Sequence, residues 1–230
     1  MSDFMKRHQP KTMKDVVLSN MTQMVIFNMV ASGQSHANLL LYGANGTGKT
    51  SLAHALIADY FAAYNDNDMC EYINMTRMKD FNRLRNTIGL VPLSVSGRRW
   101  LLIDEVEKVT NKHLLDELHD IIDNSYNCSF ILTTNNKGAL PGGSISRCQA
   151  IAIEVPSPDQ FLPRAQEIVN AEGIEATGAD VLAVLQQGDA DLRGYMFRLE
   201  MFCLSRRNAG LTIPAPVVAP PPPPPQQTTP

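Results

Sequence analysis

One stretch of the chain, from Leu39 to Ser51, constrains the fold more than any other feature, and it reads LLLYGANGTGKTS. Three leucines and a tyrosine form a short apolar run that is typical of a buried strand. After Gly43 come four residues and then Gly48-Lys49-Thr50, which is the spacing G-x-x-x-x-G-K-[ST] of a phosphate-binding loop. From Lys49 onward, apolar residues recur at helical spacing. The loop is therefore expected to join a strand to a helix.

The residue types in this loop suit phosphate binding. Its glycines let successive backbone N–H groups turn inward, where they can cradle phosphates. Lys49 adds a positive charge, and the Thr50 hydroxyl is a suitable Mg²⁺ ligand. A plain glycine-rich turn is the alternative, but the flanking strand and helix favour nucleotide binding. The expected nucleotide-binding residues are Gly43, Ala44, Asn45, Gly46, Thr47, Gly48, Lys49, Thr50 and Ser51.

Polar residues follow two later apolar runs. The run 100–104 ends in Asp104, which Glu105 follows directly. Such a pair suits a metal-dependent phosphoanhydride site, with Asp104 holding Mg²⁺ and Glu105 orienting and deprotonating a water molecule. Acids after a strand are common by themselves, and the phosphate-binding loop upstream makes this pair informative. The run 129–134 ends at Asn135, which is either a γ-phosphate contact or an ordinary turn residue.

Alternating strands and helices predict an α/β fold with a parallel five-stranded sheet. We expect its strands at 39–42, 70–74, 100–104, 129–134 and 150–155. Pro156 and Pro158 mark a boundary, and three helices follow, the last capped by Asp189 or Asp191. Beyond Arg207 the prolines specify a polyproline II tail, which is either a docking peptide or a spacer. We expect a nucleotide-binding domain (1–156), a helical lid domain (157–208) and a disordered proline-rich tail (209–230).

The amino-acid composition limits the classes of partner that this chain can bind. The formal net charge is only −3, so contact with nucleic acid requires a local basic patch. Arg77, Arg83 and Arg85 cluster around a helix expected at 80–90 and form either such a patch or an ordinary solvated face. No apolar run approaches the ~18 residues of a membrane span, and the N-terminus lacks the apolar core of a secretion signal. The four cysteines show no C-x-x-C spacing, which argues against zinc and fits a reducing cytoplasm.

With these motifs in view, the chain resembles the AAA+ ATPases, and within them the clamp-loader subunits of the replication factor C type and their bacteriophage relatives. Ser146-Arg147-Cys148 matches the family's SRC signature, and Asp191-Leu192-Arg193 is similar to its second sensor. Other stretches match its phosphate loop, acidic strand and first sensor, and one is similar to its N-terminal box. These are YGANGTGKTS (42–51), LLIDE (101–105), FILTTN (130–135), and Pro10-Lys11-Thr12 with Asp15-Val16-Val17.

The resemblance implies ATP and Mg²⁺ as ligands and roles for particular residues. Asn135 would sense the γ-phosphate, Arg193 would reach the nucleotide from the lid, and Arg147 would act as an arginine finger in the neighbouring subunit's site. Val16 and Val17 would pack near the adenine, while Lys49, Thr50, Asp104 and Glu105 would bind and hydrolyse ATP. The active form would be a homo- or hetero-oligomer on primer–template DNA that loads a sliding clamp, with Arg85 on the helix that tracks the DNA.

The chain also departs from the family. His8-Gln9 stands where a tyrosine and an arginine are usual, and the helix at 114–123 has His119-Asp120 in place of an arginine pair. The sequence ends without the family's helical collar, so the proline tail is a candidate tether for a partner that carries one. Two alternatives remain open. One is another AAA+ remodeller, such as a helicase loader or branch-migration motor, and the other is a nucleotide-binding module that has lost catalysis.

Overall fold

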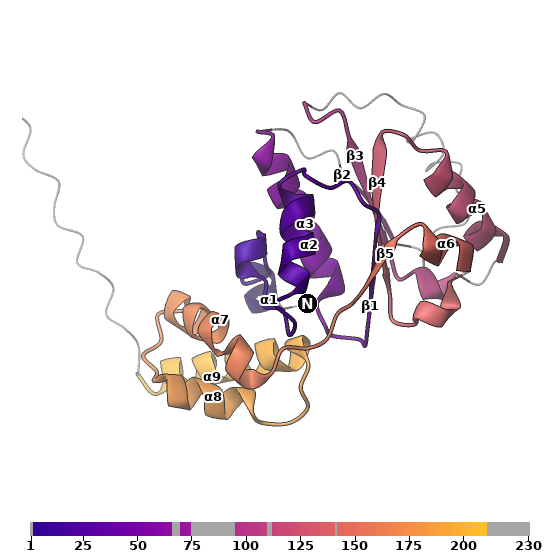
Figure 1. Cartoon of the computed structure of the whole chain (residues 1–230). Helices are drawn as coiled ribbons and strands as arrows, with labels where there is room; N and C mark the ends of the chain where they lie inside the picture. Colours follow the sequence, from indigo (N-terminus) through magenta and orange to yellow (C-terminus); the bar gives the residue numbers. More distant parts are fainter. Residues whose placement is uncertain (1, 66–69, 75–94, 110–111, 141, 211–230) are drawn as a thin grey trace, which may run out of the picture.

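The computed structural model describes residues 2–65, 70–74, 95–109, 112–140 and 142–210 (Figure 1). Within them lie a parallel sheet, helices on both of its faces, and a separate group of helices at the C-terminal end. The helices are α1 (Asp3–Arg7), α2 (Gln23–Ala31), α3 (Lys49–Ala63), α5 (Lys112–Asp123), α6 (Gly142–Ser146), α7 (Pro158–Ala171), α8 (Gly178–Leu185) and α9 (Leu192–Asn208). Three short 3₁₀ turns are η1 (Met13–Asp15), η3 (Val106–Lys108) and η4 (Lys137–Ala139).

The sheet has five strands in the order β2-β3-β4-β1-β5, and every pairing is parallel. Because the strands are parallel, their carboxyl ends share one edge, where Asn74 pairs in register with Asp104 and Tyr42 with Thr134. This arrangement confirms the predicted α/β class. The strands are β1 (Leu39–Tyr42), β2 (Cys70–Asn74), β3 (Arg99–Asp104), β4 (Cys128–Thr134) and β5 (Gln149–Ala152).

The two faces of the sheet are covered by different helices (Figure 1). On one face, Leu52, Leu56 and Tyr60 of α3 pack with the α2 residue Phe27. On the other, an apolar cluster includes Leu118 of α5 and residues of β3 and β4. All positions of β3 and β4 are buried, as expected for strands covered on both sides. The ends of β3 and β4, which present the polar side chains, are therefore anchored in a core that is packed on both faces.

Helices α7, α8 and α9 enclose an apolar cluster of their own, which includes Phe161, Val181 and Tyr195. Of the two prolines predicted to mark a boundary, Pro158 is the first residue of α7, and Ser157 accepts a hydrogen bond from the Gln160 N–H at 3.2 Å. Of the two predicted caps for α9, the structure selects Asp191, which accepts from the Gly194 N–H at 2.8 Å. The three-helix lid is thus present, while the exact domain boundaries stay predictions.

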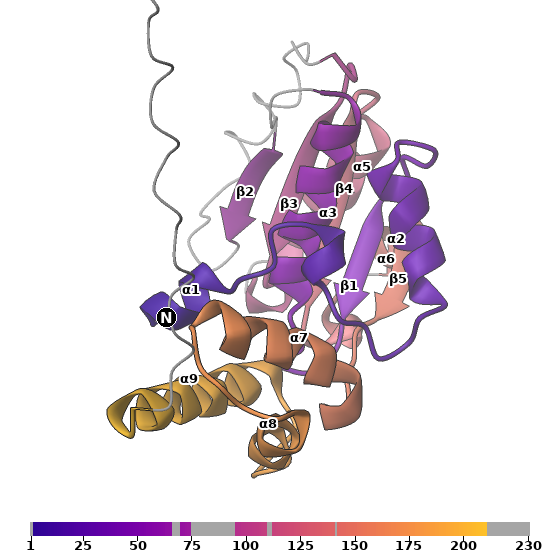
Figure 2. The same ribbon diagram turned by 90° about the vertical axis from the view of Figure 1, so that its left-hand side faces the viewer.

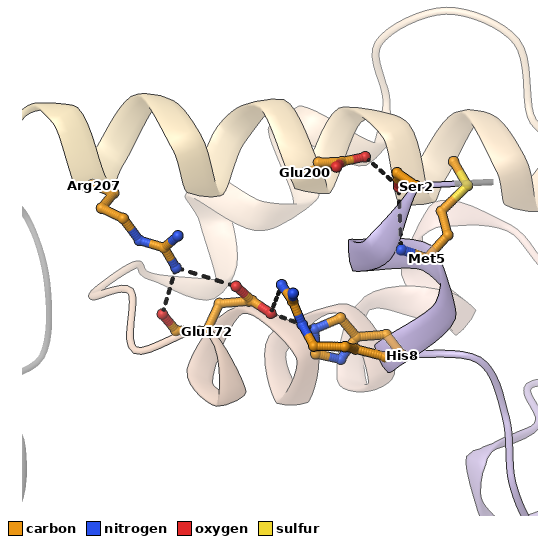
Figure 3. A network of polar contacts seen from close by, with 7 residues as sticks. Ser2, Met5, His8, Glu172, Glu200 and Arg207 are labelled. Atoms are coloured by element: carbon orange, nitrogen blue, oxygen red, sulfur yellow. Dashed lines mark hydrogen bonds and ion pairs between the residues drawn. The ribbon is translucent and has the colours of Figure 1, made fainter.

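The N-terminal helix α1, which the sequence analysis did not predict, docks on the lid beside α9 (Figure 2). Phe4 is buried in the lid cluster. Figure 3 shows the polar part of this contact, in which Glu172 accepts hydrogen bonds from His8 at 2.7 Å, Arg7 at 2.8 Å and Arg207 at 3.1 Å. The first and last described elements are therefore joined by both apolar and ionic contacts.

Three predictions need comment. Strand β5 ends at Ala152, short of the predicted end at residue 155, because its neighbour β1 turns into the loop after Tyr42. The helix expected at 80–90, with Arg77, Arg83 and Arg85, lies outside the described residues, and so does the tail from residue 211. None of the described helices is both long and apolar enough to cross a membrane.

Candidate active site

A cavity of ≈ 640 Å³ lies where the carboxyl edge of the sheet meets the lid and the N-terminal arm. Its walls come from parts of the chain that are far apart in sequence. The arm and lid contribute Met5, His8, Gln9, Pro10, Asp15, Val16, Val17, Leu18, Phe161, Arg164, Ile168, Leu192, Arg193 and Met196. The loop and strand ends contribute Asn45, Gly46, Thr47, Gly48, Lys49, Thr50, Ser51, Leu52, Asp104, Glu105, Glu107, Thr133, Thr134 and Asn135.

The glycine-rich loop leads directly into α3, whose first residue is Lys49. The N-terminus of a helix carries partial positive charge and unpaired N–H groups, which favour an anion. At the start of the loop, Gly43 passes so close to the chain after β5 that a Cβ there would lie 2.1 Å from the Ile153 carbonyl oxygen. Gly43 and Ala44 are not among the residues lining the cavity, unlike the predicted residues 45–51. Their contribution is to shape the loop and to accept hydrogen bonds.

The Lys49 ammonium is held against the loop itself. Its Nζ donates to the carbonyl oxygens of Gly43 at 2.9 Å and Ala44 at 2.7 Å, and the residue is only 8% exposed. Burial lowers the pKa of Lys49, and the carboxylates of Glu107 and Asp104 act in the opposite direction. The cavity therefore concentrates positive charge at the loop and negative charge at the strand ends.

Asp104, at the end of β3, is fixed by three hydroxyl groups from three other elements. Its Oδ1 accepts from Thr50 Oγ1 of α3 at 2.8 Å and from Thr133 Oγ1 of β4, and its Oδ2 accepts from Tyr72 Oη of β2 at 2.8 Å. A carboxylate held this way cannot rotate without breaking hydrogen bonds. The structure thus brings together Thr50 and Asp104, the two predicted Mg²⁺ ligands.

The donor atoms at this point fit Mg²⁺, as they fit hard cations in general. A threonine hydroxyl and a carboxylate are hard oxygen ligands, and Mg²⁺ is usually held by one or two such groups together with water and substrate phosphates. The described residues contain no group of three or more His, Cys, Asp or Glu side chains that would form an all-protein metal cage. Thr50 Oγ1 and Asp104 Oδ1, which lie 2.8 Å apart, are the atoms that would hold such a cation.

Glu105 follows β3 in the left-handed region, with φ 59° and ψ 45°. This conformation is strained for a residue other than glycine, and such strain occurs often at active sites. The Glu105 N–H donates to Thr133 Oγ1 at 3.1 Å. The carboxylate accepts from Asn74 Nδ2 at 3.2 Å and pairs with Lys108 Nζ at 2.6 Å. Both of its oxygens are therefore engaged at the rim of the cavity.

Asn135 and Arg193 also reach the cavity, as predicted, from the end of β4 and the first turn of α9. Val16 and Val17 line it too, and they pack at the same time: Val16 against the sheet cluster and Val17 against the lid cluster. These valines thus contribute both to the cavity wall and to the packing of the arm. The roles of all four residues toward a nucleotide stay predictions.

Arg147 lies elsewhere. Its side chain is 31% exposed, pairs with Asp123 of α5 through Nε, and donates to the Gly143 carbonyl oxygen at 2.7 Å. It is not among the residues that line the cavity. The hydrogen bond and charge of Asp123 raise the pKa of Arg147 further, so the guanidinium stays charged. This arginine is at the surface and not buried in the core of its own subunit.

The sequence model of the ATPase family associated with various cellular activities (AAA) matches residues 39–156, just over half of the chain. This segment runs from β1 to a point two residues before α7 and contains the loop, the acidic strand end and Asn135. The chain belongs to the AAA family. The family match covers the sheet domain, and the lid and arm complete the cavity from outside it.

Curated relatives of this AAA chain include several clamp-loader subunits. The replication factor C large subunit of Methanococcus maripaludis is 26% identical over 204 residues, which are 84% of this chain and 40% of that protein. The sliding-clamp-loader large subunit of enterobacteria phage T4 is 28% identical over 193 residues, covering 78% of this chain and 58% of that protein. Replication factor C subunit 4 of Caenorhabditis elegans is 24% identical over 197 residues, covering 82% and 59%. The chain thus spans roughly half of each relative.

Solved structures show the same AAA architecture. The Thermotoga maritima RuvB Holliday junction branch migration motor superimposes with a TM-score of 0.74 over 90% of this chain and 68% of that one. The sequences are only 14% identical, so this likeness concerns the fold alone. The predicted AAA+ fold is confirmed. The predicted resemblance to clamp-loader subunits is confirmed by the curated relatives.

The residues of this AAA site that sequence reasoning missed include four that touch the predicted groups: Tyr72, Asn74, Glu107 and Thr133. Tyr72 and Asn74 lie on β2, and the rule that parallel strands end at one edge would have placed them beside Asp104. Thr133 is part of β4, just before the predicted Asn135. No sequence pattern singled out Glu107, which lies in a short 3₁₀ turn directly after the acidic pair Asp104-Glu105.

Proposed function

We propose that this chain is an ATP-hydrolysing subunit of a clamp-loader-type assembly. The observation that carries the proposal is the convergence of Lys49, Thr50, Asp104 and Glu105 on one cavity, at the edge where a helix N-terminus faces the strand ends. The similarity to replication factor C subunits and to the T4 sliding-clamp-loader subunit supports the clamp-loader class.

In this proposal the loop amides and Lys49 bind the triphosphate. Mg²⁺, held by Thr50 and Asp104, would neutralise charge on the phosphoryl oxygens. Glu105 takes the proton of the attacking water, and to do so it exchanges Lys108 or Asn74 for that water. Asn135 contacts the γ-phosphoryl group from the end of β4. Its place in the cavity supports this role.

The lid and the arm would form the rest of the nucleotide pocket. Arg193 lies in the first turn of α9, and its charge lowers the pKa of Lys49, so the two cations act on the same region. Val16 and Val17 contribute apolar surface from the arm side, where the base would lie. A nucleotide would thus contact the sheet domain through its phosphates and the lid through its sugar and base.

Arg147 would complete the site of a neighbouring subunit. Its position at the surface, outside its own cavity, supports a role in trans. A positive charge added to the developing phosphoryl charge is worth ~10³ to 10⁵ in rate. ATP turnover would then require assembly of AAA+ subunits, identical or different.

Two exposed apolar stripes offer surfaces for that assembly. Met21, Val25 and Met29 lie along α2 and the residues just before it, and are 65%, 62% and 43% exposed. Phe197, Met201 and Leu204 lie along α9 and are 55%, 44% and 43% exposed. Exposed apolar patches on a soluble protein commonly mark contacts. Two different stripes on one chain fit a heterologous, head-to-tail interface between copies. The α9 stripe begins one turn beyond Arg193, so a neighbour seated on it would lie next to the cavity.

Primer–template DNA and a sliding clamp are the partners that this class implies. The predicted DNA contacts Arg77, Arg83 and Arg85 remain a proposal based on the resemblance. A branch-migration motor or helicase loader is the alternative, and a pull-down with a sliding clamp against a helicase separates the two. The alternative of a module without catalysis conflicts with the complete set of site residues, and hydrolysis above that of a Glu105→Gln variant would exclude it.

A mixing experiment tests the mechanism. The Arg147→Ala variant keeps every group of its own cavity but lacks the arginine finger. The Glu105→Gln variant lacks the general base but keeps the arginine finger. Each variant alone should bind ATP and show no DNA-stimulated hydrolysis. Mixed, they should regain part of the activity, because mixed interfaces combine an intact cavity with an intact finger. Normal stimulated turnover by Arg147→Ala alone would rule out the finger in trans.

A further inference from the structure

We propose that Glu107 is a positioning residue that sets the orientation of the Asn135 carboxamide, and through it the preference of the site for a triphosphate. The inference rests on the proposed nucleotide-binding function and deepens it. Glu107 lies in η3, the short turn that follows the acidic end of β3, and Asn135 follows β4. Both side chains line the cavity.

The contact between them is short and charge-assisted. Asn135 Nδ2 donates to Glu107 Oε1 at 2.5 Å. Hydrogen bonds to an ionised carboxylate are roughly twice as strong as those between neutral groups. They fix the direction of the donor, so this contact determines which end of the carboxamide faces Glu107.

The other carboxylate oxygen argues against a purely structural role. Glu107 Oε2 is buried and accepts no hydrogen bond from the part of the chain that the structure describes. Leaving a buried polar atom without a partner destabilises the folded protein, and more so when the atom belongs to a charged group. A residue selected only for packing would not carry that cost. The same carboxylate is the leading charge that opposes the lowering of the Lys49 pKa, so it faces the phosphate-binding loop as well.

The orientation of a carboxamide matters because its two ends have opposite character. The NH₂ group donates two hydrogen bonds, and the oxygen only accepts. With one N–H held by Glu107, the second N–H stays available as a donor to a phosphoryl oxygen, and Oδ1 can accept from a water molecule. Without Glu107 the group can rotate by 180°, which would turn an acceptor toward an anion. Glu107 would therefore act on ATP through Asn135 without touching the nucleotide.

The test measures the preference for triphosphate over diphosphate, as the ratio of the ADP dissociation constant to that of a slowly hydrolysed ATP analogue, with Mg²⁺ present. We expect Asn135→Ala to reduce this preference about tenfold, since one hydrogen bond to a charged group is lost. Glu107→Ala should reduce it by a similar factor, and the double variant by no more than the larger single effect, because both act through one contact. Glu107→Gln keeps an acceptor oxygen and should stay within about threefold of the unmodified chain.

Glu154→Gln serves as the matched control, because Glu154 is exposed and lies outside the cavity lining. Additive effects of Glu107→Ala and Asn135→Ala would overturn the inference, and so would an unchanged preference in either variant. A Glu107→Gln variant as impaired as Glu107→Ala would also overturn it, because the charge and not the hydrogen bond would then be responsible.

The result of this test does not depend on whether the chain hydrolyses ATP. Non-additive loss of preference in a chain that hydrolyses no ATP would support the role of Glu107 and contradict the proposed hydrolysis. Hydrolysis by a chain in which the two substitutions add would contradict only the role of Glu107. In an active chain, the two alanine variants should raise the KM for ATP by similar factors and leave the ADP dissociation constant nearly unchanged, which a general loss of structure would not do.

Discussion

The backbone N–H of Leu192 donates a hydrogen bond to the carbonyl oxygen of Gly46 at 3.0 Å. This bond joins the first residue of α9 to the middle of the phosphate-binding loop. Asp191, which caps α9, lies on the same side: a Cβ at Gly46 would meet its Oδ1 at 3.0 Å and its Cβ at 3.3 Å. The lid and the loop are therefore in direct contact, so a nucleotide that orders the loop also affects the position of the lid.

Gly46→Ala should weaken ATP binding at least tenfold. Gly46 has φ +77°, where a side chain costs roughly 1–2 kcal/mol, and the new methyl group would press on the capped first turn of α9. Calorimetric titration measures the effect. Gly97→Ala is the matched control, because Gly97 has φ +64° but no atom of the described residues lies within 4 Å of the added Cβ. Equal loss of ATP affinity in both variants would contradict the lid contact.

Asp123→Asn should change the ATP turnover of the assembled protein by less than about threefold, because exposed ion pairs are weak in water. Asp123 holds the Arg147 guanidinium in its own subunit, and the side chains are 44% and 31% exposed. The arginine can therefore leave this partner easily, whereas Arg147→Ala should abolish stimulated turnover. If Asp123→Asn were as inactive as Arg147→Ala, the pair itself would be needed and the finger in trans would lose its support.

Phe197→Asp and Val25→Asp should each prevent assembly without unfolding the subunit. Both side chains are more than half exposed, and a carboxylate placed in an apolar contact would have to be desolvated. The mass of the complex, measured with an ATP analogue present, gives the result. Val95→Asp is the control, since Val95 is 76% exposed but belongs to neither stripe. An unchanged mass for both stripe variants would exclude these surfaces as the interface.

The docking of α1 through Glu172 should weaken at acid pH. Burial alone would raise the pKa of Glu172, but hydrogen bonds from His8, Arg7 and Arg207 lower it to about 2. The pKa of the folded protein is thus below the unfolded value near 4.5, so the stabilisation is present above pH ~4.5 and is lost as the pH falls toward 2. The full effect is at most about 3 kcal/mol.

Unfolding measured from pH 5 to 2 should therefore show a steeper loss of stability in the unmodified chain than in Glu172→Gln. Glu167→Gln is a suitable control, because Glu167 is 67% exposed and, among the described residues, pairs with Arg164 alone. Parallel profiles for the unmodified chain and Glu172→Gln would show that the ionic contact in Figure 3 contributes nothing to stability.

Much of the site was predictable because its signals are local. The spacing from Gly43 to Thr50 requires a particular loop, and an apolar run that ends at Asp104 places an acid at a strand end. Once the strands are parallel, these groups meet at one edge. The hydroxyls of Tyr72 and Thr133 were not predicted, because a tyrosine or threonine within a strand does not by itself indicate which group it will bind, and only the parallel pairing of the strands brings both close to Asp104.

The sequence by itself determined the phosphate-binding loop, the acidic strand end, the alternating α/β order and the helical lid, since each depends on spacing along a short piece of chain. Only the tertiary structure decided that α1 docks on the lid through Glu172, that Leu192 bonds to Gly46, and that Glu107 holds Asn135. These contacts either join segments that are far apart in the chain or fix one of the many orientations that a side chain can take. Packing selects them, and no local pattern records the choice.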